Sequence, residues 1–292
     1  MTAPATVPDG DALTSGRFAF GRNWSRFLAT INEPRITAAG DSLGKLLGAS
    51  ELKGQRFLDA GCGSGLFSLA ASRAGAEVVS FDYDPDCVAC TSELRRRFSG
   101  GEAAPWRIER GSLLDESYLR SLGTFDVVYC WGVAHHTGAM WQAIDNLLPA
   151  VAPHGRIVLA IYNDQQYISR LWSGIKRTYQ RLPGFLRPLY VAAIGSATFF
   201  KRLAVTCLAS LLRLVTFRNP LVPFLNWFRE TQARGMHGWY DLVDWVGGWP
   251  FEVAQPEEIF RHLRDQGFTL RELVTCPGHG CNEFVFERTD PA

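Results

Sequence analysis

The stretch FLDAGCGSG, residues 57–65, decides the fold, because it places three glycines and one acidic residue at the end of an apolar run. The run 56–60 predicts a buried strand, and the segment 66–75 behind the glycines predicts a helix. Glycines at such a junction permit a sharp backbone turn and let a ligand approach without a clash against Cβ. The sequence therefore predicts a strand–loop–helix unit that binds a charged or polar ligand.

Short apolar runs alternate with helix-like segments around this loop. We expect strands at 56–60, 77–82, 106–111, 125–131 and 156–162, and helices at 66–75, 86–99, 116–123 and 139–152. Near-continuous apolar strands separated by helices predict an α/β fold, with a parallel sheet covered on both faces. Towards the C-terminus, a helix over 256–268 precedes strands at 269–275 and 282–288, which predict an antiparallel hairpin at the sheet edge.

Composition narrows the class of protein. The chain has 292 residues, of which 47% are apolar and 20% charged, as in ordinary globular proteins. Its net charge of +1 argues against nucleic acid as the main partner. Scattered cysteines and a polar segment 1–16 without a secretory signal favour a cytoplasmic location. Cys87 and Cys90 have no second pair at zinc spacing, so we expect no metal and interpret them as buried helix residues.

The chain divides into three parts by its sequence pattern. Residues 1–55 are interpreted as a flexible leader and a helical cap segment, and 56–162 with 251–292 as the core. Residues 163–250 break the strand–helix alternation with prolines and a dense apolar run. This segment predicts a helical insertion into the core.

The apolar run 189–217 within the insertion has several interpretations. Lys201 and Arg202 interrupt it, which leaves pieces shorter than the ~18–20 apolar residues of a membrane-spanning helix. We therefore interpret the insertion as a lid over the site, with a membrane-surface element or a buried helical pair that completes the core as the alternatives.

Asp59, two residues before the first glycine, distinguishes between ligand classes. A carboxylate there repels a pyrophosphate at the helix N-terminus, whereas it attracts the ammonium group of a methionine moiety. The third glycine also comes one residue too early for the dinucleotide pattern G-x-G-x-x-G. Both observations favour S-adenosylmethionine over NAD.

The ends of the next two expected strands predict contacts to a nucleoside. Asp82 suits ribose hydroxyls in either cofactor class, and Tyr83 is placed to pack beside the ribose or adenine. In GSLLD, Ser112 and Leu113 offer polar and apolar contacts to adenine. Asp115 either accepts a hydrogen bond from the adenine amino group or caps the following helix.

The run FLDAGCGSG, followed in order by Asp82, GSLLD (111–115) and FDVVYCWGVAHH (125–136), resembles class I S-adenosylmethionine-dependent methyltransferases, in particular their quinol-methylase-like and small-molecule branches. The resemblance covers about 56–165 and 250–288. It implies a Rossmann-like seven-stranded sheet with the last strand antiparallel, and S-adenosylmethionine as cofactor. It also implies cofactor contacts by Asp59, Gly61, Gly63, Gly65, Asp82, Ser112 and Leu113, with Cys130 lining the pocket after the fourth strand.

Methyl transfer needs a positioned nucleophile and the removal of its proton, because the leaving group is neutral. His135 and His136 follow the fourth strand and are candidate general bases, since histidine titrates near neutrality. Adjacent residues point in different directions, so we expect only one to face the substrate, and we favour His136. The alternative is structural hydrogen bonding by both.

Aromatic and polar side chains are candidate substrate contacts, with simple packing as the alternative. They are Phe18, Phe20, Trp24, Trp131, Tyr162 and Asn163 and, near the exit of the insertion, Arg234, His237, Tyr240 and Asp241. The sequence thus predicts a methyltransferase for a small, partly apolar acceptor of quinol, prenyl or natural-product type. An NAD-dependent oxidoreductase and a non-catalytic cofactor-binding scaffold are the alternatives.

Overall fold

The computed structural model describes residues 21, 24, 28, 30–49, 51–99, 105–233, 238–276, 278 and 280–289, without the side chains of 229–233, 238–241 and 244. The chain forms two compact units. The first comprises Met1–Ser173 and Trp249–Ala292, and the second comprises Gly174–Gly248.

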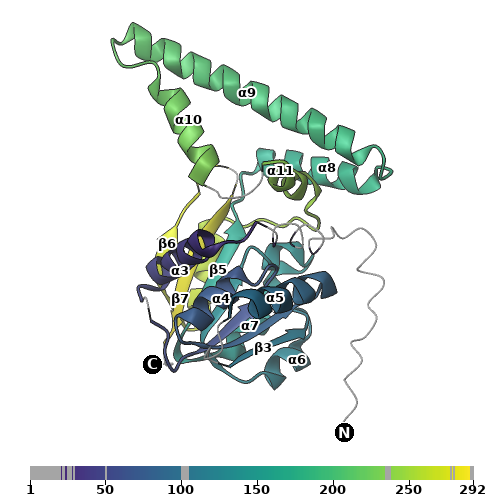
Figure 1. Ribbon diagram of the computed structural model, residues 1–292, viewed down its shortest axis with the longest axis vertical. Coiled ribbons are helices and arrows are strands. Elements are labelled where there is room, and N and C mark those ends of the chain that lie inside the picture. The colour runs from purple at the N-terminus through teal and green to yellow at the C-terminus, as the bar shows by residue number, and fades with distance from the viewer. Residues whose placement is uncertain are drawn as a thin grey trace. The chain divides into compact units, whose positions relative to one another are not determined.

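Within the described residues of the first unit, seven strands form one sheet in the order β3-β2-β1-β4-β5-β7-β6 (Figure 1). Their bounds are β1 Arg56–Ala60, β2 Glu77–Asp82, β3 Trp106–Arg110, β4 Phe125–Trp131, β5 Val151–Tyr162, β6 Phe268–Val274 and β7 Cys281–Arg288. The pairs among β1 to β5 are parallel, whereas β7 is antiparallel to both β5 and β6. The predicted Rossmann-like sheet and its C-terminal hairpin are confirmed.

Helices cover both faces of this sheet. They are α3 Glu33–Leu47, α4 Leu66–Arg73 and α5 Pro85–Phe98 on one face, and α6 Glu116–Ser121, α7 Met140–Leu147 and α12 Pro256–Asp265 on the other. Successive strand residues point to opposite faces, so Phe57 of β1 packs with α3 to α5 while Leu58 packs with α6, α7 and α12. The alternation yields two apolar layers around one sheet.

The junction of α7 and β5 differs from the expectation. The helix predicted over 139–152 ends at Leu147 and continues as a 3-10 turn, η2 Leu148–Ala150. Pro149 lacks the backbone N–H that would extend the α-helix. Consequently Val151 already pairs with Phe125, and β5 starts earlier than residue 156.

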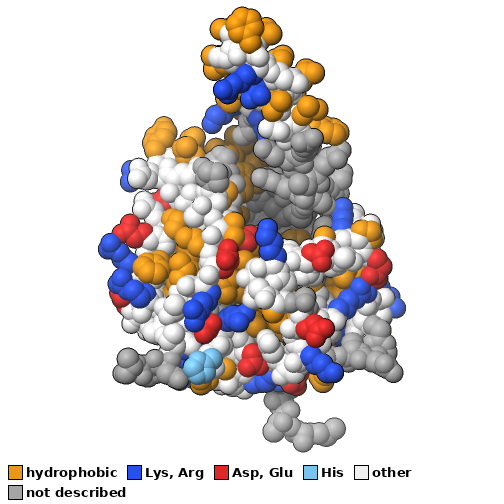
Figure 2. Space-filling model, turned by 90° about the vertical axis from the view of Figure 1, so that its left-hand side faces the viewer, with side chains coloured by type: hydrophobic (Ala, Val, Ile, Leu, Met, Phe, Trp, Pro, Cys, Tyr) orange, Lys and Arg blue, Asp and Glu red, His pale blue; other side chains and the backbone are white. Residues whose placement is uncertain are grey.

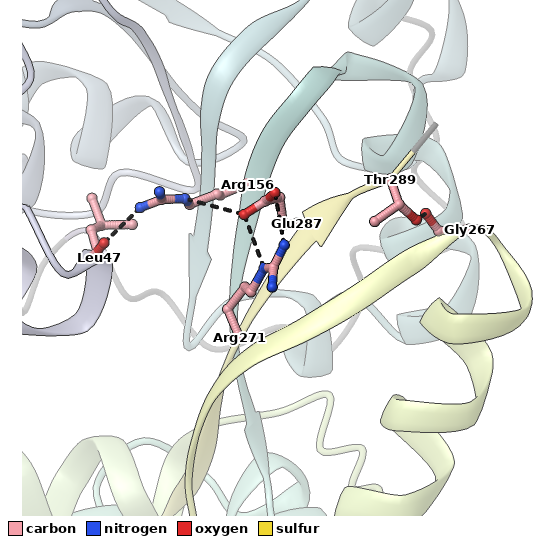
Figure 3. Close-up of polar contacts among 6 residues, drawn as sticks. All are labelled: Leu47, Arg156, Gly267, Arg271, Glu287 and Thr289. Atoms are coloured by element: carbon pink, nitrogen blue, oxygen red, sulfur yellow. Dashed lines mark hydrogen bonds and ion pairs between the residues drawn. The ribbon is translucent and has the colours of Figure 1, made fainter. Parts of the chain in front are cut away.

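Charged side chains tie the hairpin edge of the sheet together (Figure 3). Glu287 of β7 accepts hydrogen bonds from Nε and Nη2 of Arg271 on β6, both at 3.0 Å. Arg156 of β5 approaches the same carboxylate at 4.0 Å and donates to the Leu47 carbonyl at 2.6 Å. The Arg271 guanidinium lowers the pKa of Glu287. Exposed pairs of this kind contribute only about 0–1 kcal/mol to stability.

The second unit is helical. It contains the end of α8 Tyr167–Arg181, followed by α9 Arg187–Val215, α10 Val222–Ala233 and α11 Gly238–Gly247. Lys176 is buried, donates to the Trp245 carbonyl and lies 4.8 Å from the centre of the Trp245 ring. Gln180 donates to the Gly247 carbonyl at 2.6 Å. These contacts hold α8 to α11, and both α10 and α11 pack on α9.

The continuity of α9 corrects one expectation. The helix runs through Lys201 and Arg202 over 29 residues, because both are good helix formers and neither removes a backbone hydrogen bond. Among the described helices, α9 is the one long and apolar enough to cross a membrane, with a mean hydropathy of 1.4 over 18 residues. The prediction of short apolar pieces is therefore wrong. The buried helical pair is also wrong, because only 11% of that window is buried.

Candidate functional site

The glycine loop joins β1 to α4, and its backbone needs glycine. Gly61, Gly63 and Gly65 have φ values of 87°, 54° and 78°, in the left-handed region. A Cβ on Gly61 would lie 2.4 Å from Val133 Cγ1, and one on Gly65 would lie 2.7 Å from Thr91 Cγ2. The loop is therefore packed between the segment after β4 and helix α5, which the sequence pattern did not reveal.

Asp82, at the end of β2, lies beside this loop. Its Oδ2 accepts from the Gly63 N–H at 3.0 Å, and its Oδ1 accepts from the Asp84 N–H at 2.9 Å. Asp84 in turn accepts from the Gly21 N–H at 2.9 Å. Asp82 thus sets the shape of the loop, and its predicted contact to a ribose stays a prediction.

Asp59 is buried and belongs to a polar chain inside the first unit. It accepts a hydrogen bond from Ser68 Oγ, which lies 2.7 Å from Ser80 Oγ. Trp106 Nε1 donates to Ser80 Oγ at 2.8 Å. Burial raises the pKa of Asp59 to about 7. Asp59 therefore attracts an ammonium group more weakly below neutral pH, where it is protonated. The prediction from the sequence treated Asp59 as always ionised.

The segment after β3 holds the predicted adenine contacts. Ser112 Oγ accepts from the Leu114 N–H at 3.2 Å, and Leu113 is buried. Asp115 accepts from the Tyr118 N–H at 3.0 Å and from Ser117 Oγ at 2.7 Å. The interpretation of Asp115 as the cap of α6 is confirmed.

Two further candidates lie at the ends of strands. The Tyr83 carbonyl accepts from Arg110 Nε at 3.2 Å, and the Arg110 guanidinium lies 5.5 Å from the centre of the Tyr83 ring. Cys130 is fully buried in β4, and burial raises the pKa of its thiol to about 12. Its thiol is therefore protonated at neutral pH, and its place in the lining of the pocket stays a prediction.

The two histidines form a 3-10 turn, η1 Ala134–His136, directly after Val133, which contacts Gly61. Their rings lie 4.5 Å apart, and they pack on Tyr162 at 3.9 Å for His135 and 5.4 Å for His136, between ring centres. Both rings thus pack on the same tyrosine, and the expectation that only one histidine faces the substrate stays a prediction.

The hydrogen bond of His136 defines its tautomer. Nδ1 lies 2.6 Å from the Pro250 carbonyl oxygen. Since a carbonyl only accepts, Nδ1 carries the proton, and in the neutral ring the lone pair is on Nε2. His136 can therefore take a proton at Nε2 while Pro250 orients the ring.

The segment after the second unit anchors this turn, and sequence reasoning missed it. The Glu252 N–H donates to the His135 carbonyl at 3.0 Å. The Glu252 carboxylate accepts from the Met140 N–H at 3.1 Å, at the start of α7. Its burial raises its pKa. No local pattern identifies Glu252, because its partners are more than a hundred residues away in the chain.

Two tryptophans predicted to contact the substrate have different neighbours in the structure. A Cβ on Gly63 would meet Trp24 Nε1 at 3.2 Å, so Trp24 lies on the glycine loop. Trp131 is 40% exposed, and its ring centre lies 6.3 Å from that of Phe67. Its side chain also hydrogen-bonds to Glu283, an acidic residue that was not predicted.

Asn163 has a structural role at the end of β5. Its Nδ2 donates to the Cys276 carbonyl at 3.0 Å, and its Oδ1 accepts from Asn282 at 3.1 Å. Phe18, Phe20, Arg234 and His237 lie outside the described residues, as do the side chains of Tyr240 and Asp241 in α11. Their proposed roles stay predictions.

Cys87 and Cys90 are buried in α5, as expected for helix residues. Burial raises the pKa of the Cys90 thiol to about 11. Within the described part of the chain, no group of three or more His, Cys, Asp or Glu side chains is arranged to hold a metal ion.

The core of the first unit matches a known family. Residues 58–157 match a family described as "Methyltransferase domain". A glycine loop after β1, an acid at the end of β2 and an antiparallel β7 accompany that match. Residues 58–157 therefore carry a methyltransferase domain, and the comparisons support a class I S-adenosylmethionine-dependent methyltransferase.

Curated relatives resemble the core of this chain. It is 27% identical over 154 residues to the ubiquinone biosynthesis O-methyltransferase of Xanthomonas oryzae pv. oryzae, which covers 49% of this chain and 61% of that protein. It is 28% identical over 153 residues to the protein of the same name from Xylella fastidiosa, covering 49% and 59%. The chain thus spans about three fifths of the length of these relatives.

Solved structures show the same fold. Magnesium protoporphyrin IX methyltransferase from Synechocystis PCC 6803, solved with S-adenosylmethionine, aligns with a TM-score of 0.52 at 13% identity, over 99% of this chain and 100% of that one. An O-methyltransferase family protein from Burkholderia thailandensis aligns with a TM-score of 0.50 at 13% identity, over 94% and 59%.

Proposed function

We propose that this protein transfers the methyl group of S-adenosylmethionine to a small, partly apolar acceptor, with a phenolic or quinol-type oxygen as the first choice. The observation that carries the proposal is the contact between two segments: Val133, next to the histidine turn, packs on Gly61 of the glycine loop. A candidate base is thereby held beside a candidate cofactor loop. The names of the relatives support an oxygen acceptor on a ring.

The residues present fit this cofactor. The loop has no Cβ atoms at its three glycines, and Asp82 presents a carboxylate at the end of the neighbouring strand. An ionised carboxylate accepts more than two hydrogen bonds, which suits paired ribose hydroxyls. Asp59 and Gly63 would border the methionine part, and Ser112 and Leu113 the adenine.

When bound, the cofactor supplies an electrophilic methyl group on a positively charged sulfur. The chain's own contribution is to orient the acceptor and to take its proton. His136 would accept the hydroxyl proton at Nε2 as the acceptor oxygen bonds to the methyl carbon and the carbon–sulfur bond breaks. The Pro250 carbonyl, 2.6 Å from Nδ1, would stabilise the resulting imidazolium. Trp131 and Tyr162 would offer aromatic surface to a flat acceptor.

Two measurements test the proposal against its alternatives. Calorimetry with S-adenosylmethionine, S-adenosylhomocysteine and NAD is expected to give binding to the first two only. Binding to NAD alone would favour the oxidoreductase. Transfer of a radioactive methyl group is then measured with a panel of catechols, hydroquinones, prenylated phenols and amines. Cofactor binding without transfer to any of them would favour a non-catalytic scaffold.

The predicted lid role of the insertion is tested separately. Deleting residues 234–245 is expected to raise the KM for the acceptor at unchanged cofactor affinity, because a lid contributes to acceptor binding. Unchanged kinetics would exclude the lid. A cytoplasmic location and the absence of a nucleic-acid partner stay predictions.

A further inference from the structure

The second unit carries a large exposed apolar surface on the end of α9, the following turn and α10, which we name the tip surface. Its exposed members are Phe199, Phe200, Val205, Leu208, Leu211, Leu212, Leu214, Val215, Phe217, Leu221, Phe224, Leu225 and Phe228. Figure 2 shows hydrophobic side chains gathered at the top of the view, with Lys and Arg side chains among them. Contiguous apolar surface of this kind marks a binding surface rather than chance exposure.

The charge around the tip surface has a single sign. The whole chain is balanced, with 30 Lys and Arg against 29 Asp and Glu. Residues 199–228, which carry the tip surface, in contrast contain no Asp or Glu. Their basic residues are Lys201, Arg202, Arg213 and Arg218. Lys201, Arg202 and Arg218 are exposed.

Basic side chains combined with exposed Phe and Leu fit one kind of partner, an anionic phospholipid surface. Apolar side chains enter the interface between headgroups and acyl chains, while Lys and Arg pair with phosphates. The Lys and Arg stems also remain at the interface when their neighbours insert. Lys201 and Arg202 therefore do not oppose insertion at the membrane surface.

The connections of the second unit to the first indicate whether α9 lies on the membrane or crosses it. Both ends of the second unit continue into the first, where β5 before it pairs with β7 after it. Both ends must consequently be on one side of a bilayer. A helix of 29 residues spans about 43 Å, but the 12 residues of α10 span only about 18 Å, short of a ~30 Å hydrocarbon core.

The return path also contains Glu230, Asp241 and Asp244, which disfavour a second crossing. We propose that the tip surface docks on an anionic membrane and inserts into one leaflet without spanning it. This inference stands apart from the proposed function, because lipid binding and methyl transfer are measured independently.

The test is co-sedimentation of the full chain with vesicles of phosphatidylcholine alone or with 30% phosphatidylglycerol. We expect at least tenfold tighter binding to the anionic vesicles, weakened by raised salt. The triple variant Phe217→Ser, Leu221→Ser, Phe224→Ser is expected to lose at least tenfold of this binding. The matched control, Tyr167→Ser with Leu273→Ser, removes exposed apolar side chains outside the tip surface and is expected to bind normally.

A second pair of variants tests the charges. Lys201→Glu with Arg202→Glu is expected to remove the preference for anionic vesicles, whereas Lys45→Glu with Lys53→Glu, the same charge change on the first unit, is expected to retain it. Circular dichroism and binding of S-adenosylhomocysteine verify that each variant is folded. Absence of vesicle binding, or binding equal in both triple and control variants, would overturn the proposal. So would a stable dimer that the triple variant abolishes, because the tip surface would then bind a second copy.

Discussion

The loops at the carboxyl ends of β1 and β2, around Asp82, differ from the tip surface of the second unit in what determines their structure. In these loops the backbone N–H groups of Gly63 and Asp84 donate to the Asp82 carboxylate. A Cβ on any of the three loop glycines would lie within 3.2 Å of a neighbouring side chain. At the tip surface, side chains such as Phe217 and Leu211 are largely exposed and few polar contacts specify their positions. Specific hydrogen bonds determine the structure around Asp82, whereas the tip surface is distinguished by the apolar character of its side chains.

Substitutions should therefore have different effects in the two regions. A region fixed by specific contacts responds strongly to one changed atom, and a region defined by composition responds to the sum of many side chains.

Replacing His136 is expected to have the largest effect. His136→Ala should lower kcat by about 10²–10⁴-fold, the usual contribution of a general base, while the affinity for S-adenosylhomocysteine changes little. His136→Asn keeps a donor for the Pro250 carbonyl and should lower kcat as well, with loss of the low-pH limb of the rate profile. If Asn restores normal turnover, His136 only positions the turn.

Replacing Asp59 tests whether the buried carboxylate destabilises the fold when it is ionised. A pKa raised from 3.8 to about 7 means that ionised Asp59 destabilises the fold, by at most about 4 kcal/mol. Stability is lost as the pH rises from about 4 to about 7 and is constant above, because the folded state retains the proton longer. Asp59→Asn should therefore gain stability relative to the parent as the pH rises through this window.

Denaturant unfolding at several pH values measures this gain. Ser72→Ala, at another buried serine of α4, provides the control, and its effect should not depend on pH. A pH-independent difference for Asp59→Asn would show that Asp59 does not titrate in this range.

Asp82→Ala is expected to weaken cofactor binding by about 1–3 kcal/mol, the cost of leaving hydrogen-bonding groups without their partner. Calorimetry with S-adenosylhomocysteine measures it. Asp86→Ala removes an exposed carboxylate at the start of α5 and should leave the affinity within a factor of two. Normal affinity in Asp82→Ala would show that the ribose contact is wrongly assigned.

Substitutions at the tip surface are expected to have the smallest effect on folding. Phe217→Ser, Leu221→Ser and Phe224→Ser should each change the free energy of unfolding by no more than about 0.5 kcal/mol, as exposed sites do. Leu58→Ala, in the buried core, should cost about 2–5 kcal/mol in the same experiment. A core-like loss at the tip surface would mean that these side chains are packed in solution.

Much of the fold could be predicted from the sequence, because strands and helices depend on local periodicity. The bounds of β1, β2 and β4 agree with the apolar runs, and the glycine loop was placed correctly. The exposure of α9 could not be predicted, since an apolar helix in a core and one on a surface have the same composition.

The candidate site was predictable only in part. Asp82 and the glycines belong to one local motif and were found together. The hydrogen bond from His136 to Pro250 joins residues 114 positions apart, and Ser68, Ser80 and Trp106 reach Asp59 from three different elements. Contacts of this kind depend on topology, which periodicity does not define.

The two ends of the insertion are fastened to each other inside the first unit. Ala254 donates to the Tyr162 carbonyl at 3.1 Å, and Asp164 donates to the Ala254 carbonyl at 3.1 Å, so a parallel bridge joins Asn163 to Ala254. For the sheet, the helical segment is therefore a loop with its two ends joined. The entropic cost of closing such a loop grows only slowly with its length. A segment held in this way can therefore differ in length or sequence at little cost to the folding of the sheet.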